Sequence, residues 1–145
     1  MDKCLKSIVP QINTTIEILV IDNKSSENTK KVVESYSNSF SNIKYFSEPN
    51  IGLSHARNRG IKEAKSDWIL YLDDDTIAFS DLIERALYLV SRGDFDCVGG
   101  MYYGYFDVEK PKWIPENFGT KSKYSDDLQL CPFNVPHGCV VLYKS

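Results

Sequence analysis

The sequence has no long run of apolar residues. Its apolar stretches, such as those within Ile16–Ile21 and Trp68–Leu72, fall far short of the roughly 20 residues that cross a bilayer. The first residues, MDKCLKSIVPQ, also lack the continuous apolar stretch and the small-residue cleavage site of a secretory signal. We therefore expect a cytoplasmic protein without a membrane span. Its four cysteines are expected to be reduced thiols: Cys4, Cys97, Cys131 and Cys139.

A surplus of positive charge is absent too. The chain has 17 Lys and Arg against 20 Asp and Glu, a net charge of -3, which leaves no electrostatic footprint for nucleic acid. Cys131, His137 and Cys139 follow no common zinc spacing, lack a fourth ligand and do not suggest a Cys–His nucleophile. His55 is expected at a helix surface. These observations exclude nucleic acid as a partner and give zinc no support.

The chain is long enough and hydrophobic enough to form one buried core. Its 145 residues are 42% hydrophobic, 26% charged and 12% aromatic, a composition typical of a single globular domain. Three apolar runs predict strands buried on both faces, the second being the weakest: Glu17–Asp22, Ile43–Asn50 and Trp68–Asp75. Helical spacing predicts a helix after each strand: Asn28–Tyr36, Asn50–Lys65 and Ser80–Ser91. This alternation predicts an α/β domain with a mainly parallel sheet and flanking helices.

The amino-acid composition changes after Gly93. The aromatic and glycine-rich segment Phe95–Phe106 predicts one or two bent strands, and the proline-rich segment Glu109–Phe133 predicts a loop. A last strand is expected over Gly138–Tyr143.

Two of the predicted strands end in acid, at Asp22 and at Asp73–Asp75. In open α/β sheets, ligands bind beyond the carboxyl ends of parallel strands, so both acids can face one crevice. Mg²⁺ is usually held there by one or two carboxylates together with substrate phosphates. The alternative is that the three aspartates only cap the next helix or lie in solvent. It is weakened by the preceding buried strand, by the following Thr76 and helix, and by Asp22.

The segments EILVIDNKSSENT and EPNIGLSHARNRGIKEAKSDWILYLDDDT resemble family 2 glycosyltransferases in order and spacing. The resemblance covers roughly residues 17–87. The matching positions are Asp22, Asn23, Ser25, Thr29, Asn50, Gly52, Ala56, Arg57, Asn58, Gly60 and Asp73–Asp75. It implies a GT-A fold, with a nucleotide-binding core over about residues 14–92 and an acceptor-side region over about 93–145.

Some features of the family have no counterpart here. Members begin with a strand ending in Pro-x-Tyr-Asn, whereas this chain begins with a segment similar to the helix that follows it. The family's acidic motif with the general base is expected beyond Ser145, and Lys24 replaces a usual glycine. We therefore expect a single GT-A domain that is incomplete at both ends.

The resemblance also implies roles for the nucleotide-sugar-binding residues. Asp22 would accept an N–H of the nucleobase, with Asn23 beside it, and Arg57 would lie near the base or the diphosphate. A surface or helix-pairing arginine remains the alternative for Arg57. Asp73 would bond the ribose.

The metal follows from the same resemblance. Asp75 would hold Mn²⁺ or Mg²⁺ and Asp74 would be the spacer, although three consecutive aspartates leave the register open by one residue. The metal would neutralise charge on the departing nucleoside diphosphate.

The implied reaction is inverting transfer of a sugar from a nucleotide-diphospho-sugar, with a UDP-sugar favoured, in surface polysaccharide synthesis. The acceptor would be a saccharide or a lipid-linked saccharide, which suggests peripheral association with the inner face of the membrane. Two alternatives stay open: an inactive remnant that binds nucleotide-sugar or a partner, and a nucleotidyltransferase.

A weaker match covers Lys110–Gly119 and Val135–Ser145. In related bacterial proteins a Pro-Trp segment precedes a glycine turn and a basic strand end. Gly138 and Cys139 would form that turn and Lys144 the basic end, while Trp113 would either stack on a sugar or pack in a loop.

Overall fold

The computed structural model describes residues 1–118 and 140–144. In chain order the elements are α1 (Asp2–Ile8), η1 (Val9–Gln11), β1 (Ile18–Asp22), α2 (Thr29–Ser37), β2 (Ile43–Ser47), α3 (Leu53–Glu63), β3 (Trp68–Leu72), α4 (Leu82–Arg92), β4 (Cys97–Gly99) and β5 (Val140–Lys144). The predicted alternation of strands and helices is confirmed, and the fold is α/β. The helix expected from Ser80 begins instead at Leu82, with Asp81 at its N-cap.

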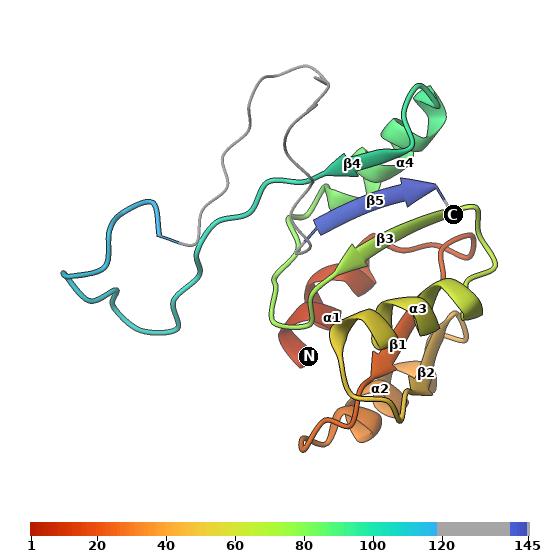
Figure 1. Ribbon diagram of the computed structural model, residues 1–145, viewed down its shortest axis with the longest axis horizontal. Coiled ribbons are helices and arrows are strands. Elements are labelled where there is room, and N and C mark those ends of the chain that lie inside the picture. The colour runs from red at the N-terminus through yellow and green to blue at the C-terminus, as the bar shows by residue number, and fades with distance from the viewer. Residues whose placement is uncertain (119–139, 145) are drawn as a thin grey trace.

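The strands form two separate sheets (Figure 1). β1 and β2 pair in parallel, with Ile18 opposite Ile43 and Asp22 opposite Ser47. β5 lies between β3 and β4 and is antiparallel to both. The parallel arrangement therefore holds for β1 and β2, and the late strands β4 and β5 add an antiparallel part.

The main core lies around β1 and β2. Leu5 of α1, Val20 of β1, Val33 of α2 and Ile43 of β2 form one buried cluster, and Val33 is fully enclosed. The next residue of β1, Ile21, points the other way, because successive strand side chains alternate between faces. A Cβ on Gly60 of α3 would lie 3.8 Å from Ile21, so α3 covers the face opposite to α1 and α2.

A gap separates the two sheets. β1 and β3 belong to different sheets, and a cavity of about 1150 Å³ lies between them. The five residues of β3, Trp68–Leu72, are all only half-buried although they are apolar or aromatic. The gap therefore leaves partly open a strand that the sequence predicts to be buried.

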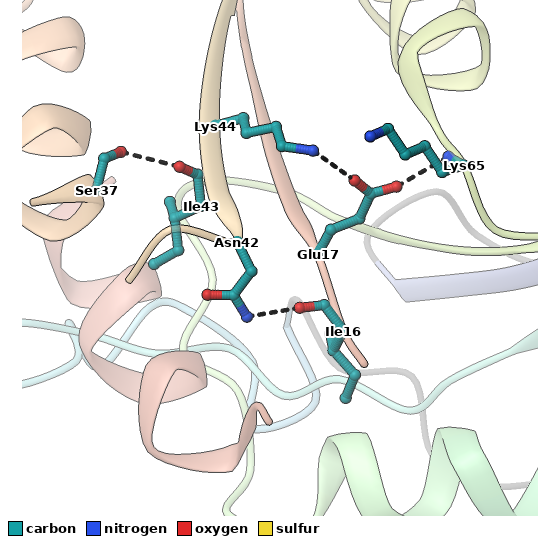
Figure 2. Close-up of polar contacts among 7 residues, drawn as sticks. All are labelled: Ile16, Glu17, Ser37, Asn42, Ile43, Lys44 and Lys65. Atoms are coloured by element: carbon teal, nitrogen blue, oxygen red, sulfur yellow. Dashed lines mark hydrogen bonds and ion pairs between the residues drawn. The ribbon is translucent and has the colours of Figure 1, made fainter. Parts of the chain in front are cut away.

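A carboxylate bridges the amino-terminal end of this gap (Figure 2). Glu17, which precedes β1, accepts a hydrogen bond from the Lys44 ammonium on β2 at 3.0 Å. Its other oxygen accepts the backbone N–H of Lys65, in the connection from α3 to β3, at 2.8 Å. Burial alone would raise the pKa of Glu17, but these bonds outweigh it and the pKa lies below its usual value. Glu17 thus joins the β1–β2 sheet to the segment that leads into β3.

Residues 100–118 leave the body of the molecule as a long irregular excursion (Figure 1). The strands expected within Phe95–Phe106 reduce to β4, Cys97–Gly99, apart from a single bridge residue at Tyr102. Among the described residues, no helix is long and apolar enough to cross a membrane. The expectations for Cys131, His137, Gly138 and Cys139 concern residues outside the described ranges.

Candidate nucleotide-binding site

Asp22 ends β1 at the carboxyl edge of the sheet. Its Oδ2 accepts the hydroxyl of Tyr45 at 2.6 Å, and its Oδ1 accepts the backbone N–H of Ser25 at 2.8 Å. Burial alone would raise the pKa of Asp22, but these hydrogen bonds outweigh it and hold the pKa below its usual value. The carboxylate is therefore ionised and fixed in orientation. Lys24, the residue that replaces a glycine, takes a left-handed φ of 58° in the turn between Asp22 and Ser25.

Asn23 is tied to the loop between β2 and α3. Its Nδ2 donates to the carbonyls of Glu48 at 3.0 Å and Asn50 at 2.6 Å, and its Oδ1 accepts the N–H of Gly52 at 2.7 Å. Gly52 has a φ of 140°, which only glycine adopts readily, and it is the N-cap of α3. Buried Glu48 closes the same loop by accepting the N–H of Asn50 at 2.8 Å. Both amide hydrogens of Asn23 are thus engaged in fixing the start of α3.

Asp73 follows the last residue of β3, and it lines the same cavity as Asp22. The hydroxyl and the backbone N–H of Thr76 both donate to the Asp73 carbonyl, at 2.6 and 3.2 Å, and they fold the three aspartates into a tight turn. The Asp73 carboxylate lies 3.9 Å from the Arg57 guanidinium. Asp74 is exposed and lies 3.8 Å from the terminal amine of Met1.

Arg57 reaches this edge from α3 and rests on Tyr71 of β3. Its guanidinium carbon lies 5.6 Å from the centre of the Tyr71 ring. The Tyr71 hydroxyl donates to the Arg57 carbonyl at 2.8 Å and accepts the Tyr143 hydroxyl at 3.0 Å. Burial, together with the bond to Tyr143, raises the pKa of Tyr71 well above its usual range. Tyr71 therefore holds both the backbone and the side chain of Arg57.

The sequence pattern did not single out Tyr71, because an aromatic residue inside an apolar run is typical of strand packing. The one available signal was position: Tyr71 precedes Asp73 by two residues, so in a continuous strand its hydroxyl would lie on the same face as the Asp73 side chain.

The family model described as glycosyl transferase family 2 matches residues 1–145. The chain belongs to this family. It is 36% identical over 118 residues to the cholesterol galactosyltransferase of Borreliella burgdorferi, an alignment that covers 79% of this chain and 33% of that protein. It is 30% identical over 104 residues to glycosyltransferase GlyG of Streptococcus pneumoniae, covering 71% of this chain and 35% of the relative. It is 27% identical over 93 residues to the uncharacterized glycosyltransferase YibD of Escherichia coli, covering 64% and 27%.

This glycosyltransferase family 2 chain spans about a third or less of the length of the curated relatives it matches. The predicted family is confirmed, and with it the GT-A class of the fold. What the relatives act on is a property of those longer proteins.

All the predicted binding residues of this family 2 chain line one cavity: Asp22, Asn23, Arg57, Asp73, Asp74 and Asp75. Within residues 1–118 and 140–144, no three His, Cys, Asp or Glu side chains gather as a metal-binding group. The acidic turn nevertheless suits Mg²⁺ or Mn²⁺, since Asp74 and Asp75 are exposed and such a cation is completed by substrate phosphates. The chemistry of the residues present therefore fits a divalent cation.

The structure also describes two predicted acceptor-side residues, Trp113 and Lys144. Trp113 is 82% exposed within the irregular excursion, so it does not pack in a loop core. Lys144 ends β5 opposite Trp68, at the start of β3 and thus at the far end of that strand from Asp73.

Proposed function

We propose that the carboxyl edge of β1 and β3 binds the nucleoside diphosphate of a nucleotide-sugar, and that the protein transfers the sugar with inversion to an acceptor hydroxyl. The observation that carries this proposal is the shared cavity. Asp22 from one sheet and the Arg57–Asp73 pair at the other line it together, although they come from distant parts of the sequence.

Asp22 is suited to accept a hydrogen bond from a nucleobase. Its carboxylate has about four lone-pair sites, and the bonds from Tyr45 and Ser25 use two of them. An N–H of uracil can therefore be accepted without displacing either partner. A UDP-sugar is the donor that we favour, because uracil offers such an N–H.

Arg57 and Asp73 are suited to the middle of the donor. The Arg57 guanidinium is a permanent cation that can form paired hydrogen bonds with phosphate oxygens. It lies 3.9 Å from the Asp73 carboxylate, so the two groups flank one part of the cavity. The Asp73 carboxylate then remains as an acceptor for ribose hydroxyls. Asn23 contributes by holding the loop that starts α3.

Asp75, with Asp74 as its neighbour, would hold Mn²⁺ or Mg²⁺. Such a cation, when bound, neutralises the charge that develops on the departing diphosphate. The acceptor hydroxyl must lose a proton to a carboxylate base as it attacks the sugar carbon, and we assign that base to no residue of this chain.

For the acceptor, we propose a saccharide or a lipid-linked saccharide in surface polysaccharide synthesis. Support comes from the bacterial relatives, one of which is named for galactosyl transfer to cholesterol, a hydroxyl on a lipid. An acceptor of this kind would place the protein at the inner face of the membrane.

The test is calorimetric titration of UDP and GDP into the chain, with and without Mn²⁺. We expect Mn²⁺-dependent binding of UDP that weakens at least tenfold in Asp75→Ala. Glu84→Ala, an exposed carboxylate on α4, is the matched control and should bind as the wild type does. Equal affinity in Asp75→Ala and wild type would refute the metal assignment.

Turnover is tested separately, by incubation with UDP-sugars and measurement of UDP release. Release supports transfer or hydrolysis of the donor, while tight binding without release supports a binding-only chain. Pyrophosphate release from UTP and a sugar phosphate would identify a nucleotidyltransferase instead.

A further inference from the structure

Tyr71 makes two kinds of contact with one arginine. Its hydroxyl donates to the backbone carbonyl of Arg57 at 2.8 Å, and its ring centre lies 5.6 Å from the central carbon of the guanidinium. The first contact ties β3 to the turn of α3 that carries Arg57, and the second supports the end of the side chain. One residue of β3 therefore holds a long and flexible cation at both its base and its tip.

The Tyr71 ring is itself packed against two other elements. A Cβ built on Gly60 of α3 would lie 3.7 Å from the ring, which is ordinary contact distance. The Tyr143 ring of β5 stacks on Tyr71 with ring centres 5.4 Å apart and an angle of 29° between the planes. The Tyr143 hydroxyl donates to the Tyr71 hydroxyl at 3.0 Å, and the Tyr71 proton is directed to the Arg57 carbonyl. The support under Arg57 is therefore fixed by β3, α3 and β5 together.

This support places the guanidinium beside the acidic turn. Tyr71 precedes Asp73 by two residues, and the Arg57 guanidinium lies 3.9 Å from the Asp73 carboxylate. All three residues line the same cavity. A cation that already rests on an aromatic face loses less conformational freedom when a ligand binds, so less of the binding free energy is spent on ordering it. A diphosphate in the cavity would therefore meet Arg57 already in place.

We propose that Tyr71 is a positioning residue for the donor, which acts through Arg57 and raises the affinity for the diphosphate. The inference rests on the proposed function, because the support of Arg57 matters only if Arg57 binds the diphosphate. Tyr71 does not bind the donor directly in this scheme, so its effect must vanish when Arg57 is replaced. Because Tyr143 stacks on Tyr71, β5 also contributes to donor binding.

The test is a double-mutant cycle on UDP binding, measured by calorimetry of the whole chain with Mn²⁺. Tyr71→Leu removes both the ring and the hydroxyl, and we expect the affinity for UDP to fall about tenfold, the scale of a partly desolvated cation–π contact. Tyr71→Phe keeps the ring and loses only the hydroxyl, so a fall of about threefold is expected. In the Arg57→Met background, neither change at Tyr71 should weaken binding further.

Tyr88→Leu is the matched control, because Tyr88 is a 63% exposed tyrosine on α4. It should bind UDP as the wild type does. Circular dichroism shows whether each variant folds, and the cycle with Tyr71→Phe decides the question if Tyr71→Leu does not fold. A general loss of structure would weaken binding in both backgrounds, whereas loss of positioning weakens it only when Arg57 is present.

Equal losses from the Tyr71 changes with and without Arg57 would overturn the inference, because Tyr71 would then act on the fold or directly on the donor. Unchanged affinity in both Tyr71 variants would overturn it as well. Failure of the proposed function gives a different result: the wild type does not bind UDP, or Arg57→Met binds it as tightly as the wild type.

Discussion

Asn23 should contribute to stability more than an ordinary half-buried asparagine, because three hydrogen bonds converge on its amide. Replacement by alanine removes the bonds to Glu48, Asn50 and Gly52 at once. Net contributions are about 1 kcal/mol for a part-buried bond and less for an exposed one, so we expect a loss of about 2 kcal/mol. That corresponds to about a 30-fold shift toward the unfolded state.

Urea unfolding measures this loss as a lower midpoint with an unchanged slope. Asn58→Ala is the control, because Asn58 is exposed on α3 and its replacement should change stability by less than about 0.5 kcal/mol. A loss below about 0.5 kcal/mol in Asn23→Ala would refute the reasoning that the amide fixes the loop.

Asn23→Asp gives a sharper version of the same test. The carboxylate still accepts the N–H of Gly52, but it turns an oxygen toward the carbonyls of Glu48 and Asn50 in place of a donor. We expect at least the loss seen in Asn23→Ala at neutral pH. Part of it should return as the pH falls toward about 4, because the neighbouring carbonyl oxygens raise the folded-state pKa of the new carboxyl above its unfolded value, and the protonated group can donate again.

Two further predictions concern carboxylates of β1 and its approach. Glu17→Ala should cost about 2 kcal/mol in urea unfolding, because the Lys65 N–H and the Lys44 ammonium both lose an acceptor. Glu17→Gln should cost about half as much, because an amide oxygen still accepts; no loss in Glu17→Gln would show that the charge is irrelevant. The lowered pKa of Asp22 means that its stabilisation is full above the unfolded-state pKa, near 3.8, and is lost as pH falls through the lower folded value. Wild type should therefore lose its advantage over Asp22→Asn on acidification below about pH 4, and parallel pH profiles would contradict the assignment.

Local pattern was sufficient to predict the strands and helices between Glu17 and Arg92. Continuous apolar runs identified β1 and β3 to within a few residues, and helical spacing identified α2, α3 and α4. The errors lie at the boundaries. α4 begins two residues after the expected Ser80, because Asp81 rather than Ser80 takes the N-cap, and side-chain type alone does not distinguish adjacent candidates.

Pairing between distant strands could not be predicted in the same way. β5 inserts between β3 and β4 in antiparallel orientation, although its sequence is another apolar run with no mark of direction.

At the candidate site, the sequence motifs predicted which side chains line the same cavity, but not which hydrogen bonds each one makes. Asp22, Arg57 and Asp73 were identified by motif, and they line a common cavity. The hydrogen bonds that tie Asn23 and Tyr71 to α3 and to the loop before it span 14 to 29 residues of sequence, so no local spacing reveals them.

The two-sheet construction divides the proposed donor site between two parts of the fold. Glu17 links β1 to the segment before β3, at the amino-terminal ends of these strands. Asp22 and Asp73 lie at the carboxyl ends of β1 and β3, which belong to separate sheets. Among the described residues, β1 and β3 share no sheet that would fix the distance between Asp22 and Asp73. If only a fraction of molecules has the closed spacing, the apparent dissociation constant for nucleotide rises by the inverse of that fraction. A change that fixes β1 relative to β3 would then lower the dissociation constant for the donor without contacting the donor.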